Sequence, residues 1–92
     1  MNILIVDDEI LAIENVENAL KNISVPDTRG RNVFRAFNIN DAKSIIATEN
    51  IDILLCDIEM PNGNGIDLVR WLYEIGYHME CIMITCYADF NY

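Results

Sequence analysis

The feature of this sequence that most constrains its fold is the alternation of two apolar patterns along the chain. Residues 3–6 and 53–56 are continuous apolar runs, which are typical of strands buried on both faces of a sheet. Between such runs, apolar residues recur every three or four positions, which is the spacing of an amphipathic helix. Strands that alternate with helices predict an α/β fold with a doubly wound parallel sheet.

The pattern predicts four strands and three helices. The strands are expected at residues 3–6, 33–37, 51–56 and 81–85. The buried faces of the helices are expected to be formed by Ile13, Val16, Leu20 and Ile23, by Ala42, Ile45 and Ile46, and, in a third helix at about residues 66–75, by Ile66, Val69, Leu72 and Ile75. Asn38 or Asn40 would cap the second helix, and Gly76 would end the third. We assign the 92 residues to one domain, residues 1–92.

The net charge and the cysteines limit which binding partners and which cellular compartment are expected. The net charge of −9 argues against nucleic acid and anionic membranes as direct partners, because both attract Lys and Arg. Cys56, Cys81 and Cys86 lack the paired spacing of a zinc site, and we interpret them as small buried hydrophobic residues in a reducing compartment. No apolar stretch approaches the roughly 18 residues of a membrane span, and the N-terminus lacks the basic region of a signal peptide. A cytoplasmic protein is therefore expected.

Acidic residues follow two of the predicted strands at the points where these strands end. Asp7 and Asp8 follow the first strand, and Asp57 follows the third. Ligands bind at the carboxyl ends of strands in open parallel sheets, so the three carboxylates would share one cavity if these strands are neighbours. Carboxylates that crowd together repel unless a cation lies among them, and Mg²⁺ prefers oxygen ligands. The sequence therefore favours a magnesium site at this edge of the sheet.

Asp57 and Thr85 indicate what such a site would do. A carboxylate can attack phosphorus to form an aspartyl phosphate, and the hydroxyl of Thr85, at the end of the fourth strand, could then donate to a phosphoryl oxygen. Taken singly, Asp57 is more typical of a turn or cap residue, the Asp7–Asp8 pair is often just a helix N-terminus, and Thr85 is uninformative. Pro61, Gly63 and Gly65 are interpreted as turn residues in the loop after Asp57.

These motifs resemble the receiver domain of bacterial two-component response regulators. "ILIVDDE" resembles the first strand of that family with its acidic pair, "DIEMPNGNG" its phosphoacceptor loop, and "IMITCYADF" its fourth strand. The resemblance implies the flavodoxin-like strand order 2-1-3-4-5. It also implies that Asp57 accepts a phosphoryl group from a histidine of a sensor kinase, and that Thr85 senses that group. Asp8, supported by Asp7, would hold Mg²⁺ together with Asp57 and the backbone carbonyl of Glu59.

The sequence departs from this family after its fourth predicted strand. The family has a fifth strand with a phosphate-contacting Lys, a nearby aromatic switch residue and a last helix, and the sequence shows no counterpart of these. We therefore expect a truncated receiver of order 2-1-3-4, from a regulator that resembles those with a helix-turn-helix DNA-binding output domain. An exposed edge at the fourth strand and an uncovered apolar face of the first strand would favour a homodimer. Mg²⁺ binding is expected to survive, while phosphorylation is expected to be slow or absent.

Two other functions remain open from the residues alone. One is an aspartate-nucleophile phosphatase or phosphotransferase of another α/β fold, which commonly has a second Asp two residues after the nucleophile, where this chain has Glu59. The other is a structural interaction domain that accepts no phosphate. We expect a phosphorylatable switch and not a turnover enzyme. Substitution of Asp57 by Asn should distinguish it from a purely structural module, which would be indifferent to the change.

Overall fold

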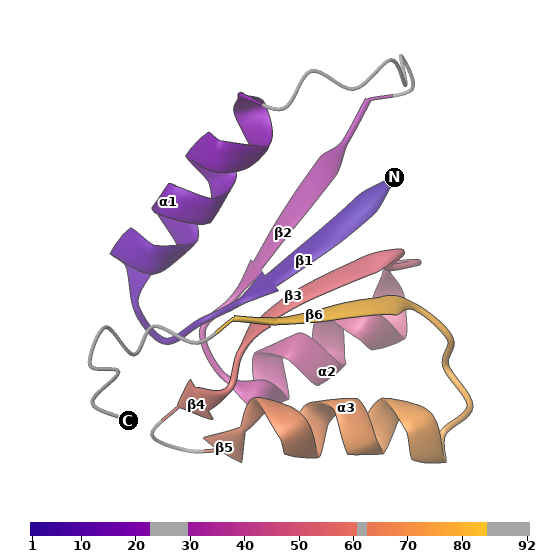
Figure 1. Cartoon of the computed structure of the whole chain (residues 1–92). Helices are drawn as coiled ribbons and strands as arrows, with labels where there is room; N and C mark the ends of the chain where they lie inside the picture. The colour runs from indigo at the N-terminus through magenta and orange to yellow at the C-terminus, as the bar shows by residue number, and fades with distance from the viewer. Residues whose placement is uncertain (23–29, 61–62, 85–92) are drawn as a thin grey trace.

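The central sheet has four strands in the order β2-β1-β3-β6. The computed structural model describes residues 1–22, 30–60 and 63–84. The strands are β1 (Asn2–Val6), β2 (Asn32–Ala36), β3 (Ile53–Asp57) and β6 (Glu80–Ile84), and every neighbouring pair is parallel (Figure 1). With β6 as the fourth predicted strand, this is the order expected for the doubly wound sheet, and the fold class is confirmed.

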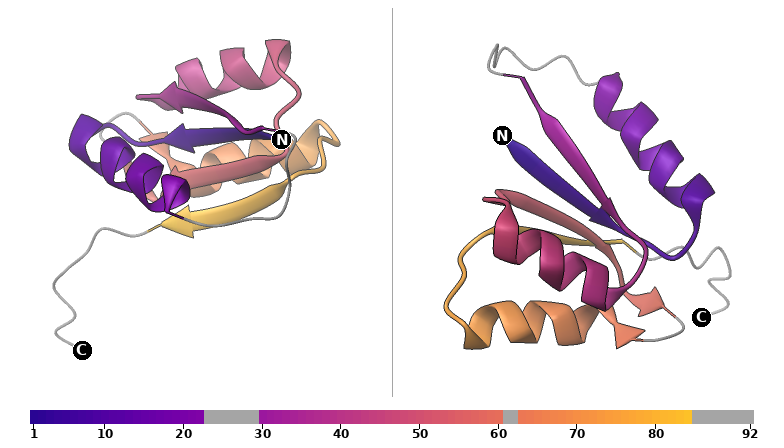
Figure 2. Two further views of the ribbon diagram at one scale, coloured as in Figure 1. Left: turned by 90° about the horizontal axis from the view of Figure 1, so that it is seen from above. Right: turned by 180° about the vertical axis from the view of Figure 1, so that it is seen from behind.

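Helices cover both faces of this sheet. α1 (Ile10–Lys21) lies on one face, and α2 (Ile39–Thr48) and α3 (Gly65–Glu74) lie together on the other (Figure 2). Each helix connects two parallel strands, so all the crossovers run over the faces of the sheet. Within the part of the chain that the structure describes, none of the helices has the length and apolar content needed to cross a membrane.

The ends of two helices follow from local chemistry. The side chain of Asn38 accepts a hydrogen bond from the backbone N–H of Asp41, so Asn38, and not Asn40, caps α2. Gly76 follows the last residues of α3 with a φ of 72°, a conformation that glycine adopts without steric cost. The prediction that Gly76 ends the third helix is confirmed.

The alternation of side chains along the strands divides the core into two layers. The layer toward α2 and α3 includes the β1 and β3 residues Leu4, Val6, Leu54 and Cys56. The layer toward α1 contains Ile3, Ile5, Ile13 and Leu55. All four apolar residues of β1 are at most 2% exposed. The expectation that the first strand has an uncovered apolar face is therefore wrong, because helices pack against both of its faces.

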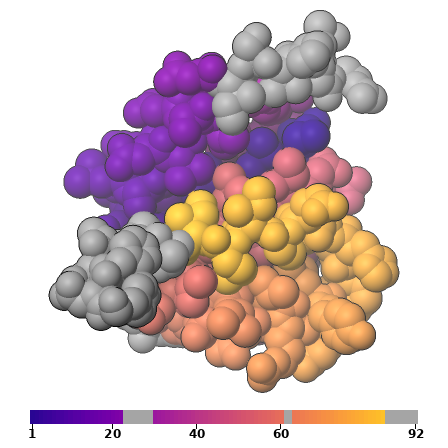
Figure 3. Space-filling model, viewed as in Figure 1, coloured from indigo at the N-terminus to yellow at the C-terminus, as the bar shows by residue number. Residues whose placement is uncertain are grey.

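β6 lies at one edge of the described sheet, as expected for the fourth strand, and some of its side chains are exposed. Ile82 is 52% exposed, and the thiol-bearing Cys81 is also exposed. The yellow atoms of this strand form part of the molecular surface in Figure 3. The interpretation of the cysteines as buried is therefore wrong for Cys81, because an edge strand has a neighbour on one side only. It is confirmed for Cys56, and Cys86 lies outside the described residues.

The buried face of α3 also differs from the prediction. Leu68 and Leu72 are buried, but Ile66 and Ile75 are 49% and 52% exposed, so their predicted inward positions are wrong. The buried row begins at Gly65 and continues through the two leucines at a spacing of three and then four residues. A count of apolar side chains overlooks the first position of this row, because it is a glycine.

A short antiparallel pair follows β3 and was not predicted. It consists of β4 (Glu59–Met60) and β5 (Gly63–Asn64). The pair lies at the carboxyl edge of the sheet and leads directly into α3 (Figure 1). The side chain of Asn64 then caps α3, since it accepts a hydrogen bond from the backbone N–H of Ile66.

Candidate functional site

Three carboxylates converge where β1 and β3 end. Val6 and Cys56 are partners in the parallel register of the two strands, so the residues that follow them lie side by side. One carboxylate oxygen from each of Asp7, Asp8 and Asp57 lies within 4.8 Å of the others. The structure thus brings together the three acids that the sequence analysis had grouped.

Asp7 is the buried member of this cluster, with 7% of its surface exposed. Its backbone N–H donates to the carbonyl oxygen of Ala36 at 3.0 Å, and its carboxylate accepts a hydrogen bond from the backbone N–H of Glu9 at 3.0 Å. Burial, together with the negative charges of Asp57 and Asp8, raises the pKa of Asp7 above its ordinary value of 3.8. The hydrogen bond from Glu9 offsets only part of this rise. The ionised form of Asp7 is therefore less favourable in this buried cluster than in water.

Asp57 is held through its backbone as well as through its carboxylate. Its Oδ1 atom accepts a hydrogen bond from the backbone N–H of Glu59 at 3.2 Å. The backbone N–H of Ile58 donates to the carbonyl oxygen of Ile84 in β6 at 3.1 Å, and the carbonyl oxygen of Ile58 accepts from the N–H of Gly65 at 2.8 Å. The end of β3 is thus fixed between a neighbouring strand and the start of α3.

Gly65 is required here by close packing and not by a turn. It does not have the positive φ that some turns demand, in contrast to Gly30 and Gly76. A Cβ atom at position 65 would collide with the carbonyl oxygen of Asp57 and would lie 3.0 Å from Sγ of Cys56. The interpretation of Gly65 as a turn residue is therefore wrong. Only a residue without a side chain lets α3 begin this close to the acidic cluster.

Gly63 is constrained in the same way, by a different neighbour. A Cβ atom at this position would lie 2.7 Å from Cγ1 of Ile39, on the first turn of α2. It too lacks a positive φ, so close packing, and not an unusual backbone conformation, is what requires glycine here. Gly63 also pairs with Met60 across residues 61 and 62, so it lies beside the loop in which it was predicted. Ile39 is a residue that the sequence analysis did not connect with the site. Pro61 and Thr85, which it did, lie outside the described residues.

Cys56 is the other reactive group beside the cluster, and its environment keeps it inert. Burial, followed by the negative charges of Asp57 and Asp7, raises the pKa of its thiol to about 12. The protonated Sγ donates to the carbonyl oxygen of Asp57 at 3.3 Å. Nucleophilic attack and metal binding by cysteine both need the thiolate, so Cys56 serves here as a packing residue.

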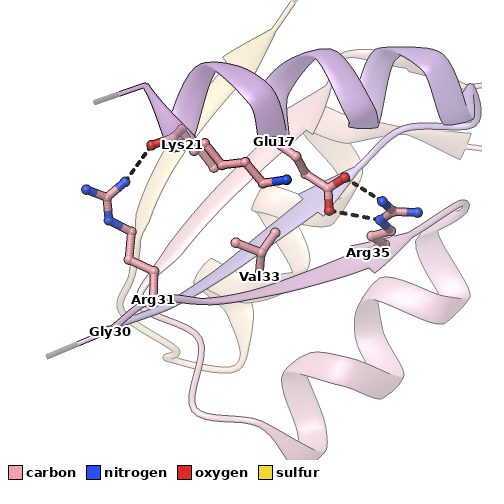
Figure 4. Close-up of a pocket in the computed structure, with 7 residues that line it drawn as sticks. Glu17, Lys21, Gly30, Arg31, Val33 and Arg35 are labelled. Atoms are coloured by element: carbon pink, nitrogen blue, oxygen red, sulfur yellow. Dashed lines mark hydrogen bonds and ion pairs between the residues drawn. The ribbon is translucent and has the colours of Figure 1, made fainter. Parts of the chain in front are cut away.

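A separate cavity of about 480 Å³ lies between the C-terminal half of α1 and β2 (Figure 4). Lys21, Arg31 and Arg35 line it, although the chain as a whole is acidic. Arg35 forms two hydrogen bonds to the carboxylate of Glu17, at 2.5 and 2.9 Å, and Arg31 donates to the carbonyl oxygen of Leu20 at 2.9 Å. These contacts connect the end of α1 to β2, so we infer that the two arginines stabilise the fold.

Almost the full length of this chain matches parts of known proteins. The model of the response regulator receiver domain family matches residues 3–92. Response regulator protein PilR of Pseudomonas aeruginosa is 34% identical over 88 residues, which cover 96% of this chain and 18% of PilR. Sensory transduction protein LytR of Streptococcus mutans is 31% identical over 93 residues, which cover 98% of this chain and 36% of LytR. The chain therefore spans much less than the full length of these relatives.

Solved structures agree with the sequence comparison. The MaeR response regulator bound to beryllium trifluoride has a TM-score of 0.83 and 32% identity, and the match covers 99% of this chain and 71% of the chain in that structure. Response regulator protein TrrA of Thermotoga maritima, in complex with Mg(2+)-BeF, has a TM-score of 0.78 and 26% identity, and the match covers 98% of this chain and 73% of the chain in that structure. On its sequence, its sheet order and these relatives, the chain belongs to the response regulator receiver domain family.

Proposed function

We propose that Asp57 of this chain accepts a phosphoryl group from a phosphohistidine of a sensor kinase. Receiver domains are phosphoacceptors of two-component systems, and they bind Mg²⁺ at an acidic pocket. The observation that carries the proposal is the convergence of Asp7, Asp8 and Asp57, from the ends of two neighbouring strands, within 4.8 Å.

The chemistry of these residues fits a magnesium ion. Asp8, Asp57 and the backbone carbonyl of Glu59 are the proposed ligands, and Asp7 supports Asp8 from the buried side. All of these donors are hard oxygen atoms, which Mg²⁺ prefers. Burial is the main cause of the raised pKa of Asp7, and the charges of Asp57 and Asp8 add to it; a divalent cation would offset both contributions. When bound, the ion would supply positive charge against the oxygens of the phosphoryl group.

The proposed transfer is a displacement at phosphorus by the carboxylate of Asp57. A carboxylate oxygen forms a bond to phosphorus while the bond between phosphorus and the imidazole nitrogen breaks. The electron pair of the broken bond stays on the imidazole, and the product is an aspartyl phosphate. The hydrogen bond from Glu59 orients the carboxylate, and the backbone hydrogen bonds of Ile58 fix the chain next to it, so positioning is the main contribution of the protein.

The remaining parts of the proposal concern the switch and the assembly. We assign the switch role to Thr85, on the resemblance of its motif alone. The domain assignment, residues 1–92, and a regulatory output elsewhere in a longer protein belong to the same proposal. We also propose that the chain self-associates through β6, which is an edge strand of the described sheet and carries the half-exposed Ile82.

Beryllofluoride, which mimics a phosphoryl group on a carboxylate, provides a test that does not depend on the kinase. With Mg²⁺ present, the chain is expected to show a bound fluorine resonance in ¹⁹F NMR, and Asp57→Asn is expected to abolish it. The matched control is Asp52→Asn, which makes the same chemical change just before the other end of β3. Binding that survives Asp57→Asn would contradict the proposal and favour an interaction domain without a phosphoacceptor.

Incubation with a small phosphodonor separates the switch from the rival enzyme. The proposal expects at most one stable phosphoryl group per chain, detected by intact-mass spectrometry and lost in Asp57→Asn. Multiple turnovers that release phosphate, with no accumulated aspartyl phosphate, would instead favour a phosphatase of the aspartate-nucleophile type.

A further inference from the structure

The β4–β5 pair, which carries Glu59, rests on the first turn of α2. A Cβ atom at Gly63 would lie 2.7 Å from Cγ1 of Ile39 and 3.6 Å from its Cβ. Real Cβ atoms almost never approach another atom closer than 3.0 Å. Ile39 therefore occupies the space that a side chain at position 63 would need, and the two residues are complementary in size.

Hydrogen bonds that begin at Asp7 of the acidic cluster fix the position of Ile39. The backbone N–H of Asp7 donates to Ala36 at the end of β2 at 3.0 Å. Asn38, two residues further on, caps α2 through a 2.8 Å hydrogen bond from the backbone N–H of Asp41. The start of α2, and with it Ile39, is thus held at a set place relative to the end of β1.

On the other side of this contact, the β4–β5 pair leads back to the cluster. Gly63 pairs with Met60, and Asn64 pairs with Glu59. The backbone N–H of Glu59 donates to the carboxylate of Asp57 at 3.2 Å. An isolated antiparallel pair of this length is not stable in water, so its position depends on what it packs against.

We propose that Ile39 is a positioning residue for the backbone carbonyl of Glu59, and that its fit against Gly63 sets the affinity of the site for Mg²⁺. The inference rests on the proposed function, because the Glu59 carbonyl acts as a ligand only in that proposal. Residues outside the ligand shell that orient ligands commonly change metal affinity by about 10–100-fold when they are substituted.

Mg²⁺ titration of the 92-residue chain by isothermal calorimetry tests this inference. Gly63→Ala places a methyl group against Ile39 and is expected to weaken Mg²⁺ binding about tenfold. Ile39→Ala removes the support and is expected to weaken binding in the same direction, and the milder Ile39→Val should do so to a smaller extent. In the double variant, which combines Gly63→Ala with Ile39→Ala, the Cβ atoms of residues 39 and 63 would lie 3.6 Å apart, which is an ordinary contact. The double variant is therefore expected to bind Mg²⁺ more tightly than either single Ala variant.

Gly76→Ala is the matched control for a loss of stability alone. Gly76 lies beyond the far end of α3, has a φ of 72°, and has open space where a Cβ would lie. The substitution strains the backbone, so it is expected to lower the urea midpoint of unfolding. Gly76→Ala is nevertheless expected to leave the affinity for Mg²⁺ unchanged. If lower stability by itself weakened Mg²⁺ binding, this variant would also bind Mg²⁺ more weakly.

Unchanged Mg²⁺ affinity in folded Gly63→Ala and Ile39→Ala would overturn the inference, and so would a double variant that binds no better than the single ones. Failure of the unsubstituted chain to bind Mg²⁺ would overturn the proposed function instead. In that case, amide hydrogen exchange at Glu59 and Gly65 tests whether Ile39 positions this backbone. Exchange should be faster in both single Ala variants than in the unsubstituted chain, and slower again in the double variant. Equal exchange rates in the unsubstituted chain and the three variants would overturn the inference.

Discussion

At the scale of single residues, Asp7 illustrates a conflict between a site and the stability of its fold. The pKa of Asp7 is raised in the folded chain, so the folded state keeps its proton to a higher pH than the unfolded state does. The free energy of unfolding therefore falls as the pH rises from the ordinary value of 3.8 through the folded pKa. This residue should make the metal-free chain less stable at neutral pH than in acid.

Asp7→Asn removes this charge but keeps an oxygen that can accept from Glu9. Without divalent cations, it is expected to raise the free energy of unfolding at neutral pH by about 0.5–2 kcal/mol, the usual gain for relieving such a conflict. Urea unfolding at a series of pH values measures the effect. The gain should vanish below pH 3.8, where the carboxyl group is protonated in both states. A gain that persisted in acid would show that shape, and not charge, is responsible.

The sequence predicted the acidic residues of the site but not the residues that fit around them. Asp7, Asp8 and Asp57 could be found because the first two come right after the first predicted strand and Asp57 comes right after the third, and strand ends are local features of a sequence. The need for glycine at positions 63 and 65 depends on the distance to Ile39 and to the Asp57 carbonyl. Such distances are set by the tertiary fold, and the GNG spacing alone fits a turn equally well.

At the scale of elements, asparagine side chains cap the first turns of α2 and α3. Two asparagines could have capped α2, and the structure selects Asn38, whose side chain accepts the N–H of Asp41 at 2.8 Å. Asn38→Ala is therefore expected to lower the free energy of unfolding by about 1 kcal/mol. Asn40→Ala is the matched control and should change it by less than about 0.5 kcal/mol, because Asn40 is exposed. Equal losses in the two variants, measured by urea unfolding, would contradict the assignment of the cap.

The four long strands and three helices were predictable because each strand is an apolar run, each helix has a period of three to four residues, and most of these elements have a clear end. The β4–β5 pair was not, since its strands of two residues are too short to show a period. The face of α3 was predicted only in part. Leu72 is buried as expected, but the buried row starts at Gly65, and the exposed Ile66 and Ile75 look like core residues in the sequence. Hydrophobic pattern therefore predicts the order of elements better than their contacts.

At the scale of the whole molecule, the net charge opposes self-association, whereas the edge strand β6 favours it. Two chains that each have a net charge of −9 repel, and salt screens this repulsion, with a Debye length of about 10 Å at 0.1 M. The exposed edge and Ile82 favour pairing by backbone hydrogen bonds and apolar contact. Association through β6 should therefore become stronger as the salt concentration rises.

Ile82→Lys separates these two contributions. The substitution lowers the net negative charge, so repulsion alone would predict stronger association, whereas a lysine on an edge strand blocks pairing. We expect the association constant from sedimentation equilibrium to fall by about tenfold, equivalent to roughly 1.4 kcal/mol. Ile66→Lys makes the same charge change at a residue that is 49% exposed on α3, compared with 52% for Ile82, and it should not weaken association. If both variants associated equally, or if Ile82→Lys associated more strongly than the unsubstituted chain, the interface would have to lie away from β6.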